Sequence, residues 1–176
     1  LMLLKNHPYF EVTFLGGSKR SLGLTYADAT RKSWFYHEPP PYGDQKVCHY
    51  KDLEKAKNCQ VIFSALPSDI SRSIDLQYAH QGALVITHGS FHRGNPIIPL
   101  VIPEINSQDL DLIIKQRVEF GPSFGGIMAK PNCSIQSYLL PLFPLLQCYT
   151  LSEIEVTTLQ SLSGAGNQAL NQLENP

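Results

Sequence analysis

The sequence has few of the features that mark nucleic-acid-binding, membrane or secreted proteins. Its 14 Lys and Arg residues are balanced by 15 Asp and Glu residues, the formal net charge is −1, and no block of like charges occurs. Nothing in this charge pattern favours binding to nucleic acid or to a membrane. No apolar run is long enough to span a membrane, and no secretory signal is visible. We expect small-molecule partners, no nucleic acid, no membrane and a cytoplasmic location.

Cysteine is scarce, and its spacing gives no sign of a disulfide framework. The four cysteines include no Cys-x-x-Cys pair and lie at positions 48, 59, 133 and 148. Without a secretory signal, this pattern favours reduced thiols in a cytosol. His88 and His92 have the i, i+4 spacing of a zinc-binding helix, but Gly89 and the surrounding loop composition argue against a metal pair. We therefore expect no metal.

Short β-rich runs alternate with helical segments along the first half of the chain. We expect strands at 10–15, 61–66 and 83–87, and helices at 52–58 and 69–81. The runs "VIFSAL" and "ALVIT" are almost continuously apolar, as in parallel strands that helices cover on both faces. An α/β fold with a doubly wound (Rossmann-like), mostly parallel sheet follows. Ligands bind beyond the carboxyl ends of such strands. The segments at these ends are "GGSKRS", "SALPSD" and "THGSFHR", so we expect the ligand-binding residues there.

The composition changes near residue 131, which divides the chain into two expected domains. Residues 1–131 form a dinucleotide-binding domain, with a proline-rich surface loop at 35–44 and a helix at 107–116 that Ser107 caps. Residues 132–176 begin a second, α+β domain with a helix and an alternating strand, "EIEVTTLQSL". The apolar start "LMLLKNHP" resembles the tail of a helix without a start signal, so we expect further sequence upstream.

Cys133 lies where an apolar strand gives way to an apolar helix. Pro131 disfavours helical geometry in the residue before it, Asn132 can cap a helix, and residues 134–146 continue that helix, bent or interrupted by two prolines. In the first turn, unpaired N–H groups and the helix dipole favour a nucleophilic thiolate, and the same groups can stabilise an oxyanion. The alternative is an inert, buried cysteine beside a structural turn. The glycosylation sequon "NCS" would require secretion.

Four motifs, in a fixed order, carry a resemblance that covers essentially the whole chain: "SALPSD", "PLVIPEIN", "KPNCSI" and "TTLQSLSGAG". Together they resemble the aspartate-semialdehyde dehydrogenase family, in its archaeal and fungal-like branch. The resemblance implies reversible, NADP-dependent conversion of aspartate semialdehyde and phosphate into aspartyl phosphate through a cysteine thioester. This reaction belongs to the biosynthesis of lysine, threonine and methionine. The resemblance also implies a homo-oligomer whose second domain is catalytic and mediates dimerisation.

The same resemblance assigns the catalytic residues. Cys133 is the expected nucleophile, Asn132 is expected to hold substrate or the developing oxyanion, and Gln160 is expected to orient the substrate. Arg93 matches the arginine that binds the acyl-acceptor phosphate, and a guanidinium fork suits phosphate oxygens. Without the resemblance, Gln160 would be a polar residue on an exposed strand face and Arg93 a solvated loop residue. The family usually has asparagine or alanine near His88, so the cofactor side departs from its pattern.

The expected cofactor is NADP. An acidic residue after the second strand of a dinucleotide fold would favour NAD, whereas "GGSKRS" offers hydroxyls and cations that suit a 2′-phosphate. The serine-rich form of this turn resembles the family's NADP site, and "SGAG" resembles the turn that approaches the nicotinamide. The expected cofactor-binding residues are Ser18, Arg20, Ser21, Ser64, Ala65, Leu66, Ser163, Gly164 and Gly166. The alternative is an ordinary polar turn with solvated cations.

Two parts that the resemblance implies do not occur in the sequence. A glycine-rich phosphate loop would precede the first residue, and a general acid/base histidine would follow the last, since none of the six histidines occupies that motif. We therefore expect a fragment that is shortened at both ends and inactive alone. Two alternatives stay open: an acyl-CoA reductase similar to malonyl-CoA reductase, which shares the cysteine thioester, and an inactive remnant that acts as a binding module.

Overall fold

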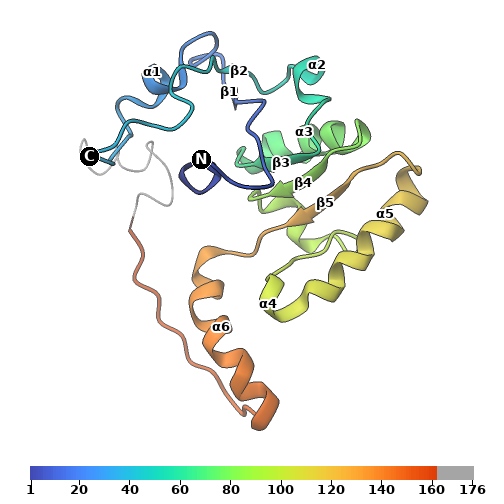
Figure 1. Cartoon of the computed structure of the whole chain (residues 1–176). Coiled ribbons are helices and arrows are strands. Elements are labelled where there is room, and N and C mark those ends of the chain that lie inside the picture. The colour runs from blue at the N-terminus through green and yellow to red at the C-terminus, as the bar shows by residue number, and fades with distance from the viewer. Residues whose placement is uncertain (162–176) are drawn as a thin grey trace. The chain divides into compact units, whose positions relative to one another are not determined.

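The computed structural model describes residues 1–161 of the chain. The chain forms two compact units, Leu1–Pro131 and Asn132–Pro176. Figure 1 shows strands surrounded by helices in the first unit and one long helix in the second. Within the described residues, no helix is both long enough and apolar enough to cross a membrane.

The centre of the first unit is a three-stranded parallel sheet in the order β3-β4-β5. The strands are β3 (Val61–Ser64), β4 (Leu84–Thr87) and β5 (Gly126–Ala129), and their last residues lie in register. A parallel pair needs a crossover connection, and helix α3 (Ser68–His80) provides it between β3 and β4. The carboxyl ends of all three strands therefore meet at one edge of the sheet.

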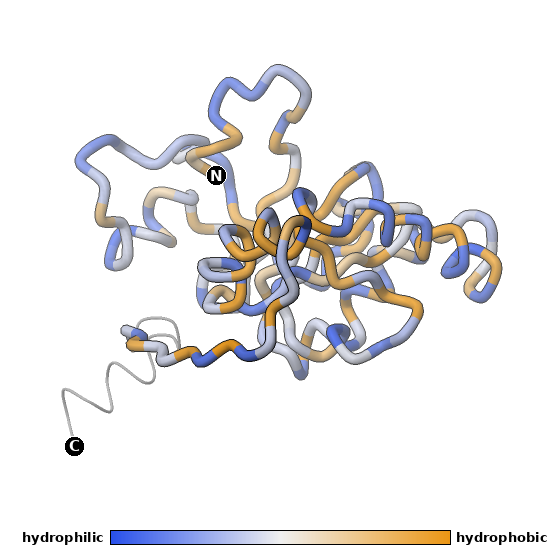
Figure 2. Tube along the Cα trace, turned by 90° about the horizontal axis from the view of Figure 1, so that it is seen from below, coloured by the Kyte–Doolittle hydropathy of each residue, from blue (hydrophilic) through white to orange (hydrophobic). Residues whose placement is uncertain are grey.

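The expected α/β fold with a parallel sheet is confirmed. The strands predicted at 61–66 and 83–87 correspond to β3 and β4, and the helix predicted at 69–81 corresponds to α3. Their apolar side chains form the core: Val85 and Ile127 have no exposed surface, and Tyr78 of α3 is 2% exposed. Figure 2 shows the hydrophobic residues concentrated in the central segments of this unit and the hydrophilic ones in its peripheral loops.

A second, two-stranded parallel sheet consists of β1 (Gly16–Gly17) and β2 (Cys48–His49). The strand predicted at 10–15 is wrong. Only the last residue of that segment bonds to β2, through the Leu15 carbonyl oxygen, which accepts from Cys48 N at 2.9 Å. Apolar β-branched composition does not make a strand unless a partner strand lies beside it, and the residues before Leu15 have no such partner in the described structure.

Short helices connect these strands. Thr25 caps α1 by accepting a hydrogen bond from Asp28 N, and Asp52 caps α2 by accepting one from Lys55 N. The helix predicted at 52–58 is shorter than expected. The bounds are η1 (Met2–Leu4), α1 (Tyr26–Thr30), α2 (Leu53–Ala56) and η2 (Phe91–Gly94), the η elements being 3₁₀ helices.

The segment after residue 102 differs from the predicted helix with Ser107 as its cap. It contains α4 (Pro103–Asn106), the 3₁₀ helix η3 (Ser107–Asp111) and α5 (Leu112–Phe120). Asn106 explains the break, because its side chain forms hydrogen bonds of 2.7–2.8 Å to Leu100 O, Ile102 N and Asp109 Oδ2. These bonds fix a turn in place of a continuous helix. Helix α5 continues to Phe120, beyond the predicted end of that helix at residue 116.

The second unit contains helix α6 (Cys133–Cys148), followed by extended chain to residue 161. Pro141 and Pro144 lie inside α6 without ending it, and none of its residues is buried. The predicted strand "EIEVTTLQSL" is wrong within the described residues, which show no strand after α6. A strand requires a ladder partner, and alternation of residue type does not supply one.

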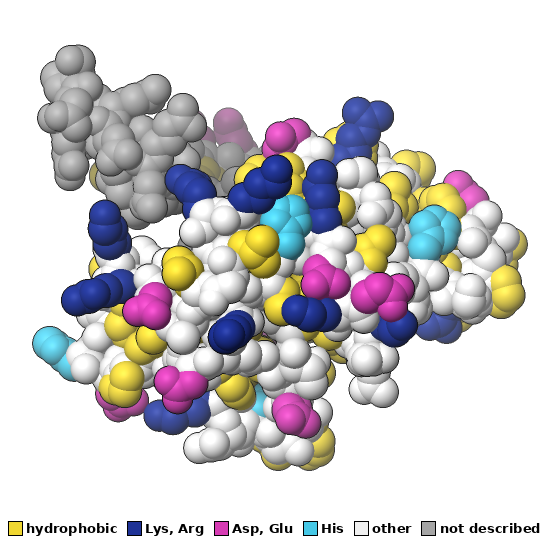
Figure 3. Space-filling view, turned by 90° about the horizontal axis from the view of Figure 1, so that it is seen from above, with side chains coloured by type: hydrophobic (Ala, Val, Ile, Leu, Met, Phe, Trp, Pro, Cys, Tyr) yellow, Lys and Arg dark blue, Asp and Glu magenta, His cyan; other side chains and the backbone are white. Residues whose placement is uncertain are grey.

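All four cysteines are free thiols, as expected. Cys48 and Cys59 are half-buried, whereas Cys133 and Cys148 are exposed. Figure 3 shows that basic and acidic side chains are interspersed over one face of the molecule, without a patch of a single sign.

Candidate active site

The turn after β1 brings together three residues predicted to bind the cofactor. Ser21 N and Ser21 Oγ both donate to Ser18 O, at 3.1 and 3.2 Å, and Arg20 N donates to Ser18 Oγ at 3.4 Å. The turn can close because residue 17 is glycine: a Cβ there would lie 2.5 Å from Ser21 Oγ. The Ser18 hydroxyl proton and the exposed Arg20 guanidinium remain free for a ligand among the described residues, whereas the Ser21 hydroxyl proton is already used.

The residues after β3 form part of the edge where the strands end. The Ser64 hydroxyl donates to Asp75 Oδ1 at 2.6 Å, and the Ser64 carbonyl oxygen accepts from His88 N at 2.8 Å. The hydroxyl and the carbonyl oxygen of Ser64 are therefore both engaged in hydrogen bonds within the protein. Ala65 is exposed and Leu66 is half-buried, directly before α3. The side of the sheet edge open to a ligand at this strand is therefore formed by Ala65 and Leu66.

A buried polar network behind this edge was not predicted. Asp75 has no exposed surface and His92 is 2% exposed, and His92 Nε2 lies 3.6 Å from Asp75 Oδ2. The network continues to Ser64 through Asp75 and connects α3 with η2. Its signal in the sequence is spacing: Ser71, Asp75 and Ala79 lie on one helical face, and all three are buried. His92 Nε2 is directed to Asp75 in the core, whereas His88 is exposed.

Arg93 follows this network and ties two strand ends together. Its Nε donates to Lys130 O at 3.1 Å and its Nη2 donates to His88 O at 3.0 Å. These bonds use two of the five N–H donors of the guanidinium. The His88 side chain is exposed but partly covered by its neighbours, and this partial burial, followed by the positive charges of Lys130 and Arg93, lowers the pKa of His88 from its usual 6.5. His88, Arg93 and Lys130 therefore form a basic corner at the carboxyl edge of β4 and β5. Lys130 was not predicted, although it directly follows a strand.

Cys133 is exposed in the first turn of α6, which excludes the alternative of a buried cysteine. Asn132 is the N-cap, as predicted: its Oδ1 accepts from Ser134 N at 2.9 Å. The same oxygen accepts from Ser134 Oγ at 2.7 Å and from the Cys133 thiol at 3.7 Å. Deprotonation of the Cys133 thiol would break this last contact, because a thiolate has no proton to donate. The Asn132 side-chain NH₂ group remains free as a donor among the described residues.

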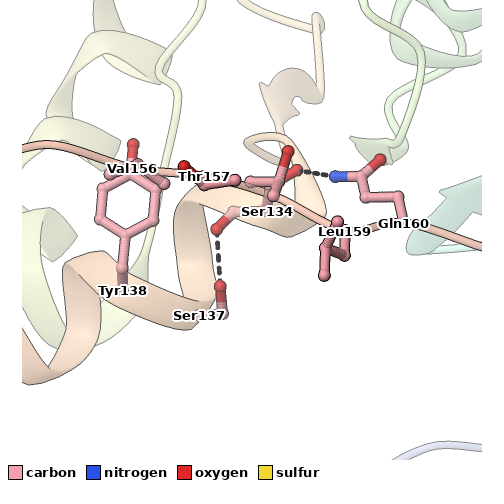
Figure 4. A pocket seen from close by; sticks show the side chains of 8 residues that line it. Ser134, Ser137, Tyr138, Val156, Thr157, Leu159 and Gln160 are labelled. Carbon is pink, nitrogen blue, oxygen red and sulfur yellow. Dashed lines mark hydrogen bonds between the residues drawn. The ribbon is translucent and has the colours of Figure 1, made fainter.

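A cavity of about 330 Å³ lies beside this turn within the second unit. The Gln160 side-chain NH₂ group donates to Ser134 Oγ at its rim, and Ser137 Oγ donates to Ser134 O at 2.7 Å (Figure 4). The lining side chains are uncharged; they belong to Ser134, Ser137, Tyr138, Val156, Thr157, Thr158, Leu159 and Gln160. The predicted Gln160 is thus connected to the cap of α6 through Ser134, which was not predicted. Cys133 adjoins this group in sequence.

Three predicted cofactor residues, Ser163, Gly164 and Gly166, lie outside the described residues. The other predicted residues fall into three groups. The turn after β1 and the edge of the central sheet belong to the first unit, and the capped thiol belongs to the second.

Comparison with known proteins gives a consistent result. Residues 1–113 match the family model "Semialdehyde dehydrogenase, NAD binding domain". An aspartate-semialdehyde dehydrogenase of Methanothermobacter thermautotrophicus is 36% identical over 168 residues, which cover 94% of this chain and 47% of that protein. A malonyl CoA reductase (NADP) of Metallosphaera sedula is 33% identical over 172 residues, which cover 98% of this chain and 47% of that protein.

Among solved structures, aspartate semialdehyde dehydrogenase with NADP from Candida albicans superposes with a TM-score of 0.72. It is 32% identical, and the match covers 83% of this chain and 42% of that one. The chain spans about half the length of the curated relatives it matches.

Proposed function

Because the chain belongs to the semialdehyde dehydrogenase family, with a matching NAD-binding domain at residues 1–113, we propose that it acts in NADP-dependent aspartate-semialdehyde chemistry. The proposed reaction interconverts aspartate semialdehyde plus phosphate and aspartyl phosphate. The observation that carries the proposal is an exposed thiol, Cys133, in the first turn of a helix capped by Asn132. A thiol in that position has N–H donors beside it and access to substrate.

Cys133 forms the bond to the substrate. Its sulfur attacks the aldehyde carbon, and the carbonyl electron pair moves to oxygen. The Asn132 NH₂ group, which has no other partner among residues 1–161, and first-turn N–H groups of α6 other than that of Ser134 can donate to this oxygen. NADP, when bound, supplies the hydride acceptor that turns the adduct into a thioester. Phosphate then attacks the thioester, the C–S bond breaks, and Cys133 leaves as a thiolate. In the reverse direction, Cys133 takes the acyl group from aspartyl phosphate without a cofactor.

The turn after β1 fits the 2′-phosphate of NADP. Ser18 offers a hydroxyl proton, Arg20 offers a guanidinium without a partner in the described part of the chain, and the Gly17 position leaves room for the turn to close. An NAD-specific site usually has an Asp or Glu that binds the ribose 2′-hydroxyl, and this turn contains no carboxylate. These features support Ser18 and Arg20 as the residues that hold the cofactor there.

The basic corner supports phosphate as the acyl acceptor. Arg93 keeps three N–H donors after its two bonds to backbone oxygens, and Lys130 adds a second cation on the neighbouring strand end. A planar guanidinium suits the spacing of phosphate oxygens. We assign inorganic phosphate, or the phosphate group of the acyl phosphate, to Arg93.

A second candidate is reduction of an acyl-CoA. The 33% identity to a malonyl CoA reductase favours it, since that comparison covers as much of this chain as the others do. Both candidates use a thioester on Cys133 and differ in the leaving group, which is phosphate in one case and coenzyme A in the other.

Release of the leaving group tests both candidates. β-Aspartyl phosphate and malonyl-CoA are added separately to the chain, and inorganic phosphate or free coenzyme A is measured over time. We expect one equivalent of phosphate from β-aspartyl phosphate, lost in Cys133→Ser and retained in the control Cys148→Ser. Release of coenzyme A without release of phosphate would support the second candidate, reduction of an acyl-CoA, in place of the first. Release that is equal in wild type and Cys133→Ser would contradict both.

A further inference from the structure

Ser134 lies between the two carboxamides of the candidate site, and its bonds can be oriented from the backbone outward. The Ser134 backbone N–H lies 2.9 Å from one side-chain atom of Asn132. A backbone N–H only donates, so that atom is the carbonyl oxygen Oδ1 and not the nitrogen. The orientation of the Asn132 carboxamide is therefore fixed by the helix cap.

The Ser134 hydroxyl lies 2.7 Å from the same oxygen. Because that oxygen has no proton, the hydroxyl donates to it and uses the only proton it has. The hydroxyl can then only accept from Gln160. The Gln160 atom that faces it is therefore the nitrogen Nε2, as Figure 4 shows. Ser134 thus sets the orientation of both amides: its backbone N–H fixes Asn132, its hydroxyl adds a second bond there, and the same hydroxyl orients Gln160.

We propose that Ser134 is a positioning residue that sets the hydrogen-bonding polarity of the site. It leaves the NH₂ group of Asn132 as a donor and the carbonyl oxygen of Gln160 as an acceptor, at a cavity lined by uncharged side chains. The proposal rests on the proposed function of Cys133 as the acyl carrier. It assigns to Ser134 a role that reaches the substrate only through its two neighbours.

The two amides have different tasks in this arrangement. The Asn132 NH₂ group donates to the oxyanion that forms when Cys133 attacks a carbonyl. The Gln160 oxygen accepts from a cationic or N–H group of the substrate, such as the ammonium of an amino-acid aldehyde. Without the Ser134 hydroxyl, Asn132 keeps only the cap bond to Ser134 N and the weak thiol contact, and Gln160 loses its partner at the cap. Gln160 can then rotate, and Asn132 is held less firmly, by the cap bond to the Ser134 backbone N–H.

Three variants test this role: Ser134→Ala removes the hydroxyl, Ser134→Thr retains it, and Ser137→Ala is the matched control. Ser137 lines the same cavity, lies one turn further along α6, and donates to Ser134 O without contacting either amide in the described structure. Loss of its hydroxyl changes the helix surface and the cavity to a similar extent. It leaves the two amide orientations intact.

Three probes separate positioning from general thiol reactivity. p-Nitrophenyl acetate acylates Cys133 through an oxyanion and needs no recognition of an aspartyl group. Iodoacetamide alkylates the sulfur at a saturated carbon, so no oxyanion forms. β-Aspartyl phosphate tests the proposed substrate. The rates are followed by p-nitrophenolate absorbance, by mass spectrometry and by phosphate release.

In Ser134→Ala we expect acylation by p-nitrophenyl acetate to fall at least about tenfold, a part of the roughly 10²–10³ that loss of an entire oxyanion donor costs. Alkylation should be unchanged. Ser134→Thr and Ser137→Ala should acylate like wild type. Equal loss of acylation and alkylation in Ser134→Ala, or an equal fall in Ser137→Ala, would overturn the inference. Wild type that reacts with p-nitrophenyl acetate but not with β-aspartyl phosphate would count against the proposed substrate, and the Ser134 comparison would still decide the positioning role.

Discussion

The two units hold their reactive groups in different ways. In the first unit, the Arg93 guanidinium donates hydrogen bonds to backbone oxygens of residues that follow β4 and β5. The preceding residue, His92, is 2% exposed and lies beside the fully buried Asp75. In the second unit, Cys133 lies on a helix with no buried residue. Its surroundings are organised by its sequence neighbours Asn132 and Ser134. One arrangement depends on tertiary packing and the other on local capping.

This difference has a consequence for mutation. Where burial holds a side chain, a substitution acts mainly through the free energy of unfolding. Where a cap holds it, a substitution can change the chemistry and leave the stability of the chain almost unaltered.

The largest expected effect on stability is in the core of the first unit. Phe124 is 1% exposed, so Phe124→Ala should lower the free energy of unfolding by about 3–5 kcal/mol. Phe143→Ala is the matched variant on α6, which has no buried residue, and it should cost less than about 1 kcal/mol. Urea unfolding followed by circular dichroism measures both. Similar losses in the two variants would mean that α6 is packed as tightly as the sheet.

The cap of α6 should show the opposite behaviour. Asn132→Ser keeps an N-cap oxygen but removes the carboxamide NH₂ group, so unfolding free energy should change by less than about 0.5 kcal/mol. Acylation of Cys133 by p-nitrophenyl acetate should fall by roughly 10²–10³, because an oxyanion donor is lost. The measurement is p-nitrophenolate release beside a urea titration. An unaltered acylation rate would show that Asn132 serves the helix alone.

Sequence reasoning succeeded where the signal is local and failed where it depends on a distant partner. The apolar runs of β3 and β4 and the Asn132 cap follow from adjacent residues, and the structure has all three. The strand predicted at 10–15 has equally suitable composition, but among the described residues the partner strand β2 pairs with Gly16–Gly17 and not with that segment. The alternating segment after α6 fails for the same reason.

The site shows the same division. The first-turn position of Cys133 could be read from Pro131 and Asn132, whereas the pair of Asp75 and His92 requires two elements to meet in the core. Ser134 was overlooked because its importance comes from Gln160, which lies 26 residues away in sequence. Spacing within one helix would have indicated Asp75, but not its partner.

The two ends of α6 offer a smaller effect within one helix. Cys133 is its first residue and Cys148 its last, and both are exposed. The helix dipole favours an anion at the first end and disfavours it at the last, by about 0.3–1 kcal/mol at each. Iodoacetamide at neutral pH should therefore label Cys133 several-fold faster than Cys148, as peptide mass spectrometry would reveal. The half-buried Cys48 and Cys59 should react more slowly still. Faster labelling of Cys148 would contradict the inference that the N-terminal position of Cys133 on α6 makes its thiol more reactive.

The smallest expected effect is at the basic corner. Burial first, and then Lys130 and Arg93, lower the pKa of His88 from 6.5. The unfolded chain therefore binds this proton more readily, so the contribution of His88 to stability is complete above pH 6.5 and decreases as the pH falls below it. Lys130→Gln should raise the pKa of His88 part of the way to 6.5, since burial remains. An NMR titration of the imidazole measures the shift. A midpoint that Lys130→Gln leaves in place would show that Lys130 does not face His88.

The central claim is that the acyl chemistry of this chain takes place on Cys133. The most direct measurement is a peptide map of the chain after brief incubation with β-aspartyl phosphate at neutral pH. Our account predicts one acyl group per chain, on the peptide that contains Cys133, removable by hydroxylamine and absent from Cys133→Ser. An acyl group on Cys148 or the half-buried cysteines, or an even distribution over all four thiols, would contradict it.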